Sequence, residues 1–238
     1  MSGNKTNHRA PAQQEKTFAR FALGQRWEHA ILILSTFVLL LTGLPQKYRD
    51  ISWSQNLLST PERLELIRQI HHIAAIVLAL EAIYHLGRVI YLMTRRKMSD
   101  AMLPNMQDIS DAWTMLLYLV FLRKTKPAFG KYNFEQKVTY WFLFFGFALM
   151  GISGFIIWFP VLFTKFLPGG IVPASKMAHS TESVVAVIFI IVWHLYHVHI
   201  ERLNLSIFTG RLSEKEMREF HAREYERVTG QSSSNNND

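Results

Sequence analysis

Four long apolar segments constrain this 238-residue chain more than any other feature of its sequence. They run from about 27 to 44, 70 to 93, 138 to 162 and 177 to 200. An α-helix rises about 1.5 Å per residue, so about 20 residues cross a hydrocarbon layer of about 30 Å. A soluble domain of this size would have to bury four helices that are apolar on every face. The sequence therefore predicts an all-α, integral membrane bundle of four transmembrane helices.

The segments between the apolar runs carry unequal numbers of Lys and Arg. The N-terminal arm, the loop between the second and third runs and the C-terminal region carry 5, 9 and 6, where the 9 includes Arg88 near the end of the second run. The other two loops carry 4 and 2. Because basic loops stay on the cytoplasmic side of a membrane, both termini and the long loop are predicted to be cytoplasmic. We expect a multi-pass protein of the bacterial inner membrane. Its basic surface indicates contact with membrane lipid and not with nucleic acid.

The sequence predicts three parts along the chain. Residues 1–24 form a cytoplasmic arm, 25–205 the four-helix transmembrane domain, and 206–238 a cytoplasmic helix with a disordered tail. The apolar stretch 112–122 is too short to span a bilayer and predicts an amphipathic helix at the cytoplasmic interface, over about 108–123. A capping box that begins at Ser213 predicts a charged helix over 212–228.

Histidines lie at two depths on three of the apolar segments. The outer level has His71, His72 and His179, and the cytoplasmic level has His29, His85, His194, His197 and His199. Ionisable side chains inside a bilayer need a cavity or a partner, and a haem is such a partner because neutral imidazole ligates its iron. The chain has no cysteine, which excludes covalent haem attachment and iron–sulfur clusters. The pattern predicts two non-covalent b haems stacked across the membrane.

Spacing alone leaves the ligand pairs open. His179 and His194 are 15 residues apart, which is about 22 Å of helix rise. His71 and His85 are 14 apart, about 21 Å, and suit the same two levels. An alternative function is a proton-coupled transporter or channel that uses buried histidines and Glu81, a carboxyl group near the middle of the second segment.

Three stretches of the sequence carry a resemblance to a known family. They are Gln25-Arg-Trp-Glu-His29 followed by Thr42-Gly43, Arg68-Gln-Ile-His71, and Gly130-Lys-Tyr-Asn133-Phe-Glu-Gln136-Lys137 followed by Tyr140-Trp141. Over roughly residues 20 to 225 the chain resembles the cytochrome b (gamma) subunit of membrane-bound formate dehydrogenases. The di-haem cytochrome b of nickel–iron hydrogenases is a more distant relative.

The resemblance implies a ligand set. It assigns His29 and His194 to a cytoplasmic-side haem, and His71 and His179 to an outer haem. The spacing in the last helix is one residue longer than in the family pattern, so His197 is an alternative to His194. Two further histidines stay open as ligands: His85, which has no counterpart in that pattern, and His72.

The resemblance also implies a function. It predicts a membrane-anchoring subunit of a respiratory oxidoreductase complex, with no dehydrogenase site of its own. Electrons would pass between a periplasm-side partner and a menaquinone or ubiquinone beside the inner haem. The partner would be an iron–sulfur subunit, a hydrogenase or a multihaem cytochrome c. Asn133 and Gln136 would line the quinone pocket, with Glu135 where the family has glycine.

Four glycines in the apolar segments would allow either a porphyrin or a neighbouring helix to approach closely. They are Gly43, Gly146, Gly151 and Gly154.

Overall fold

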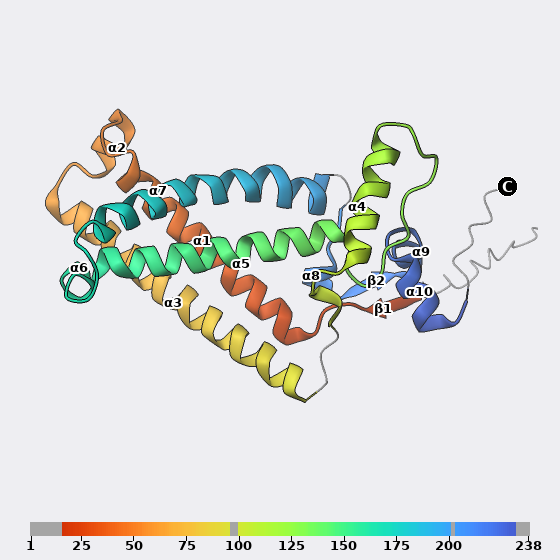
Figure 1. Cartoon of the computed structure of the whole chain (residues 1–238). Helices are drawn as coiled ribbons and strands as arrows, with labels where there is room; N and C mark the ends of the chain where they lie inside the picture. The colour runs from red at the N-terminus through yellow and green to blue at the C-terminus, as the bar shows by residue number, and fades with distance from the viewer. Residues whose placement is uncertain (1–15, 96–99, 201–202, 232–238) are drawn as a thin grey trace, which may run out of the picture.

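The computed structural model describes residues 16–95, 100–200 and 203–231. The predictions for most of the N-terminal arm and for the C-terminal tail therefore lie outside the described residues. Figure 1 shows the elements in chain order. They are β1 (Thr17–Ala19), α1 (Leu23–Lys47), α2 (Ser52–Leu57), α3 (Pro61–Thr94), η1 (Asp100–Met102), α4 (Met106–Leu119), α5 (Phe134–Trp158), α6 (Pro160–Phe163), α7 (Ile171–Phe189), η2 (Ile190–Ile200), α8 (Ser206–Thr209), β2 (Arg211–Ser213), α9 (Glu214–Phe220) and α10 (Ala222–Thr229).

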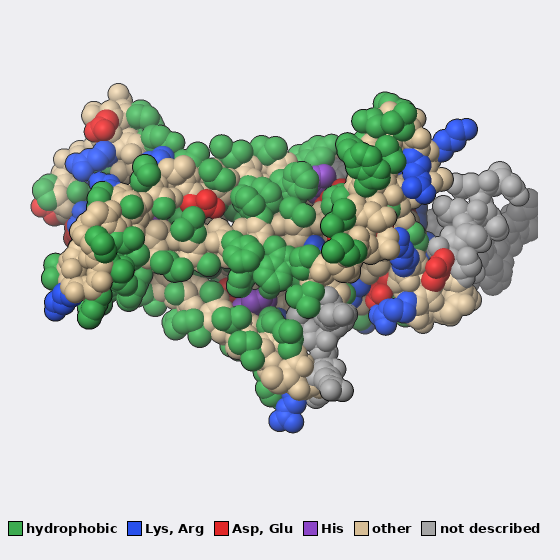
Figure 2. Space-filling view, in the orientation of Figure 1, with side chains coloured by type: hydrophobic (Ala, Val, Ile, Leu, Met, Phe, Trp, Pro, Cys, Tyr) green, Lys and Arg blue, Asp and Glu red, His purple; other side chains and the backbone are tan. Residues whose placement is uncertain are grey.

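Four helices among the described residues are long and apolar enough to cross a membrane. They are α1, α3, α5 and the continuous helix of α7 and η2. Their side chains leave many large apolar groups exposed, among them Leu34, Ile83 and Ile152. Figure 2 shows this apolar covering along the sides of the bundle, with Lys and Arg gathered at its ends. The predicted four-helix membrane bundle is confirmed.

The bundle consists of two helical hairpins. In the first, α1 packs along α3 and the short helix α2 lies between them in the chain, and in the second, α5 packs along α7 with α6 between them. Figure 1 shows α2 and α6 together at one end of the bundle, which we call the far end. The opposite end, which we call the near end, carries both described chain ends and α4.

Several helix boundaries differ from the sequence prediction, and proline accounts for two of them. α3 begins at Pro61, well before the apolar run, because Thr60 caps it and proline is favoured in the first turn of a helix. α5 ends at Trp158 instead of 162. Pro160 follows, and proline disfavours helical geometry in the preceding residue, so Phe159 turns away and a new short helix begins.

A small cap closes the near end. β1 pairs antiparallel with β2, with Phe18 opposite Leu212. Leu212, Met217 and Tyr225 form a buried core that Phe18 covers. The capping box at Ser213 is present, but the charged helix predicted over 212–228 is two helices, because the chain breaks at His221. The Nδ1 of His221 bonds the Gly130 carbonyl at 2.8 Å, so the break ties the cap to the loop before α5.

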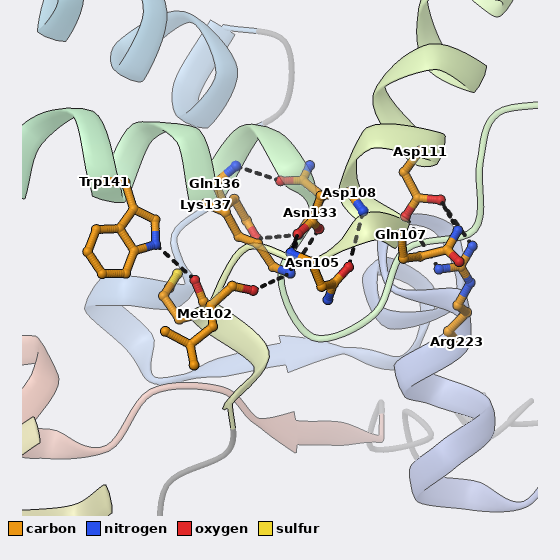
Figure 3. Close-up of polar contacts among 11 residues, drawn as sticks. Met102, Asn105, Gln107, Asp108, Asp111, Asn133, Gln136, Lys137, Trp141 and Arg223 are labelled. Carbon is orange, nitrogen blue, oxygen red and sulfur yellow. Dashed lines mark hydrogen bonds and ion pairs between the residues drawn. The ribbon is translucent and has the colours of Figure 1, made fainter.

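α4 lies across the near end and is fixed there by polar contacts (Figure 3). The Lys137 ammonium at the start of α5 lies 2.8 Å from the Asp108 carboxylate of α4. The indole of Trp141 donates to the Met102 carbonyl at 3.1 Å. On the other side, Arg223 of α10 lies 3.2 Å from Asp111. The first of these ion pairs is largely buried, and together the contacts hold α4 against both α5 and the cap.

Candidate functional site

Four histidines meet in two pairs across the bundle. The ring centroids of His29 on α1 and His194 on η2 are 6.3 Å apart, and we call these residues the near pair. Those of His71 on α3 and His179 on α7 are 6.4 Å apart, and we call these the far pair. Each pair joins the first hairpin to the second. Thr42, which contacts the far pair, lies 13 residues beyond His29 on α1, so the two levels are about 20 Å apart.

The ring separations fit two imidazoles that share one metal ion. Metal–nitrogen bonds of about 2.0 Å on opposite sides of an ion hold the ring centres ~6 Å apart. Both measured separations are close to that value. Imidazole nitrogen is also a usual ligand of haem iron. The donor set of each pair therefore suits haem.

Hydrogen bonds fix the orientation of both far-pair rings. The Thr42 hydroxyl donates to the Val38 carbonyl at 2.7 Å, so its oxygen accepts from Nδ1 of His71 at 2.8 Å. Nδ1 of His179 donates to the Met150 carbonyl at 3.0 Å, with the Ser153 hydroxyl 3.3 Å away. Metal-bound histidines usually donate their second ring nitrogen in this way. Nε2 of each ring keeps its lone pair for a metal.

Glycines make room for the same two rings. A Cβ atom at Gly43 would lie 3.2 Å from Cε1 of His71, and one at Gly154 would lie 2.9 Å from Cε1 of His179. Such contacts are tighter than ordinary van der Waals separations. Gly146 instead faces the Glu182 carboxylate, and Gly151 has open space beside it. Close approach of a histidine ring therefore accounts for Gly43 and Gly154 among the glycines noted in the sequence.

The near pair has different surroundings. Among the described residues, neither ring of this pair makes a hydrogen bond, and Phe208 packs against His29 with ring centroids 6.5 Å apart. His194 lies in the π-helix η2, whose turns are wider than those of an α-helix. This geometry accommodates the extra residue in the spacing from His179. It brings His194, and not His197, to face His29.

The alternative ligands lie outside the two pairs. His197 packs against Trp193, with ring centroids 4.6 Å apart. His72 stacks on Trp158 with centroids 4.0 Å apart. His85 is bonded on both ring nitrogens, to Glu28 at 2.9 Å and to Tyr140 at 3.2 Å. The structure thus gives each of these three rings a contact with other side chains.

Comparison with known proteins identifies the family. The model of the prokaryotic cytochrome b561 family matches residues 104–210. The formate dehydrogenase cytochrome b556(fdo) subunit of Escherichia coli K12 is 25% identical over 186 residues, which cover 77% of this chain and 80% of the relative. The nitrate-inducible cytochrome b556(Fdn) subunit of the same strain is 20% identical over 216 residues, which cover 90% and 93%. This chain is a formate dehydrogenase-type cytochrome b.

A third relative is the formate dehydrogenase cytochrome b556 subunit of Haemophilus influenzae. It is 25% identical over 171 residues, which cover 72% of this chain and 66% of the relative. The predicted family is therefore confirmed, and so is the predicted location of the cytochrome in the inner membrane. Membership of this group implies b-type haem and electron transfer as part of an oxidoreductase.

The cytochrome also contains a charged network that the sequence did not reveal. The Glu28 carboxylate is buried and accepts from Arg88 at 2.7 Å and from Nδ1 of His85 at 2.9 Å. The carboxyl group of Glu81 lies within 4.8 Å of both Glu28 and His85. The signal in the sequence was the spacing of Glu81, His85 and Arg88, which places them at i, i+4 and i+7 on one face of α3.

The residues predicted to line a quinone pocket form the N-terminal cap of α5. Asn133 Oδ1 accepts from the Gln136 backbone at 2.8 Å, and Gln136 Oε1 accepts from the Asn133 backbone at 3.2 Å. Asn133 Nδ2 donates to Glu135 at 3.0 Å. All three therefore lie together at the near end of the cytochrome (Figure 3 shows two of them). The Nε2 donor of Gln136 has no partner among the described residues.

Proposed function

We propose that this cytochrome binds two b haems and carries electrons across the membrane between a partner subunit and quinone. The two facing imidazole pairs at opposite ends of the bundle support this proposal most strongly. The near pair would hold one haem and the far pair the other. Haem iron supplies reversible one-electron chemistry when it is bound. The chain itself positions the ligand nitrogens and surrounds them with apolar helices.

We place the near end in the cytoplasm, because the basic segments of the chain gather there. The cap, α4 and both termini then face the cytoplasm. The apolar face of α4, with Met106, Ile109 and Trp113 exposed, would lie on the lipid interface. The far end then meets a periplasm-side partner. The relatives are formate dehydrogenase subunits, and an iron–sulfur or multihaem cytochrome c subunit would supply or take the electrons.

We further propose that a menaquinone or ubiquinone reacts beside the near pair. Asn133, Glu135 and Gln136 are polar groups at the membrane edge of α5, at the same end of the bundle. The Nε2 of Gln136 would donate to a quinone carbonyl, since the cap uses only the oxygen of this amide. Protons for the reduced quinone would come from the cytoplasm.

The competing function is a proton-coupled transporter or channel built on Glu81 and the buried histidines. In the structure, the histidine of this network, His85, is held by Glu28 and Tyr140, and Arg88 pairs with the same carboxylate. Such a closed network of partners suits a structural role. The relatives are cytochrome subunits, so electron transfer is the better supported function.

The haem count tests the proposal. Purified protein reduced with dithionite should give a b-type spectrum, and haem extraction should yield two haems per chain. His29→Ala and His71→Ala should each remove one. His72→Ala is the matched control, because it changes the neighbouring ring on the same helix and should retain both haems. Protein without haem, or full retention in both ligand variants, would refute the assignment.

Quinone turnover tests the pocket. Gln136→Glu keeps the oxygen that caps α5 but removes the Nε2 donor. We expect slower quinone turnover in this variant while both haems remain. Asn133→Asp is the second variant, because it likewise keeps the capping oxygen and removes the amide donor. Normal turnover in both variants would place the quinone elsewhere.

A further inference from the structure

We infer that the hydroxyl group of Thr42, together with Ser153 and the Met150 carbonyl, lowers the reduction potential of the haem at the far pair. This inference rests on the proposed di-haem function. The consequence is a direction of electron flow: electrons that arrive at the far pair move toward the near pair, whose rings have no such acceptors in the part of the chain that the structure describes. Thr42 and Ser153 are positioning residues, because they act through the histidine rings.

Each hydroxyl group can only accept from the ring beside it. The proton of Thr42 is committed to the Val38 carbonyl at 2.7 Å, and that of Ser153 to the Leu149 carbonyl at 2.6 Å. Both side chains are buried, with exposed fractions of 8% and 3%. Water therefore does not compete for these oxygen atoms. Nδ1–H of each far-pair ring must be the donor.

The two hairpins repeat this arrangement. A hydroxyl residue followed by glycine occurs at Thr42-Gly43 on α1 and at Ser153-Gly154 on α5. In each hairpin the hydroxyl oxygen meets Nδ1, and the glycine lies against Cε1, of a histidine on the partner helix. The glycine brings the ring close enough for the hydroxyl contact. The same device thus acts on both ligands of the far pair.

Donation from Nδ1–H makes an imidazole a more basic ligand. A more basic ligand stabilises ferric iron more than ferrous iron, and this lowers the reduction potential. Hydrogen bonding around the ligands is one of the main means by which proteins tune a haem. Among the described residues the rings of the near pair lack such acceptors, so the haem there keeps the higher potential. The potential difference favours electron flow from the far end to the near end.

The test is an optical redox titration of the purified cytochrome with both haems bound. Thr42→Val removes the hydroxyl acceptor beside His71 and keeps the shape of the side chain. We expect the ferrous-to-ferric ratio of the far haem, at fixed applied potential, to rise about tenfold, which corresponds to about 59 mV for a one-electron couple. The far haem is identified as the component missing from His71→Ala. The near haem should not shift.

Three further variants sharpen the result. Thr42→Ser keeps the hydroxyl group and should restore the original potential. Ser153→Ala should give a smaller upward shift, because the Met150 carbonyl still accepts from His179. Ser183→Ala is the matched control: its hydroxyl donates to the Ser180 carbonyl at 2.8 Å but contacts no imidazole nitrogen, so neither potential should move.

The outcomes separate this inference from the function on which it rests. If both haems are present but neither Thr42→Val nor Ser153→Ala raises the potential of the far haem, the inference is wrong and the proposed function stands. The same holds if Thr42→Ser behaves like Thr42→Val, or if the far haem already has the higher potential. Protein without haem contradicts the proposed function itself. If Thr42→Val loses its far haem, the inference is tested by the reduction potential of the far haem in Ser153→Ala alone.

Discussion

The two ends of the bundle each bring two histidine rings together, but in opposite surroundings. At the far end, hydroxyl groups and glycines of α1 and α5 contact the histidine rings directly. At the near end, the rings make no hydrogen bonds among the described residues, and the polar groups are bonded to one another instead: Glu28 to Arg88, and Asp108 to Lys137. Two histidine pairs of the same composition are therefore not equivalent sites, because the neighbours of each imidazole decide its basicity and its freedom to move.

The largest expected effect tests how far the near end depends on its buried ion pair. Arg88→Ala leaves the buried Glu28 carboxylate with His85 as its remaining hydrogen-bond partner among the described residues. Removal of one partner from a buried ion pair costs about 3–5 kcal/mol, so the free energy of unfolding should fall by that amount. Thermal denaturation in detergent, followed by circular dichroism, measures the change.

Arg68→Ala is the control for that experiment. Its guanidinium lies 3.2 Å from Glu65, and about half of each side chain is exposed. An exposed pair of this kind contributes about 0–1 kcal/mol. If Arg88→Ala were no more destabilising than Arg68→Ala, the near end would not depend on charge pairing, and the contrast between the two ends would be lost.

A smaller effect tests the glycine contacts of the far end. Gly154→Ala places a Cβ atom 2.9 Å from the ring of His179, so the ring or the helix must move. Overpacking of this kind costs about 1–3 kcal/mol, and we expect weaker retention of the far haem during thermal denaturation. Gly151→Ala on the same helix meets nothing within 4 Å and should be neutral or slightly stabilising. Equal behaviour of the two variants would remove the argument for a glycine contact.

The smallest effect is a response of the near-end cap to acid. Hydrogen bonds from Arg218 and Tyr225, each 2.7 Å long, hold the pKa of the Glu214 carboxyl below its ordinary value of 4.5. A group with a lowered pKa stabilises the folded state above its ordinary pKa, and this contribution disappears as the pH falls through the lowered value. Protection of the α9 and α10 amides from hydrogen exchange should therefore decline only below pH 4.5.

Glu214→Gln provides the comparison for the acid response. The amide cannot titrate, so amide protection in α9 and α10 should be weaker at neutral pH and should lack the acid step. A similar acid step in the amides around Thr42 would show that the response is global and is not a property of the cap.

Much of the far end was visible in the sequence. Thr42-Gly43 belonged to a motif, and His71 and His179 were assigned to one level. The hydroxyl contact was not visible, because Thr42 is 29 residues from His71 and nothing in a linear pattern states which face of α1 meets α3. Ser153 was missed for the same reason. A hydroxyl–glycine dipeptide on two apolar helices was the signal that would have found both.

The near end was harder to predict. Asn133 and Gln136 were assigned to a quinone pocket, and the structure shows that they cap α5. The quinone pocket itself stays a prediction. Buried charges such as Glu28 and Arg88 are unfavourable individually and become acceptable only as a pair, so composition alone gives them no place.

The sequence by itself determined the four membrane helices and the two levels of histidine, because hydrophobic length and helical rise are properties of each segment alone. Tertiary structure decided which rings face one another. The wide turns of η2 rotate His194 toward His29 and leave His197 against Trp193. In an ideal α-helix, His197 would share a face with His179, because the two are 18 residues apart, which is about five turns. Tertiary structure also decided the acceptors on each imidazole, since a hydrogen bond between helices depends on their packing and not on their order in the chain.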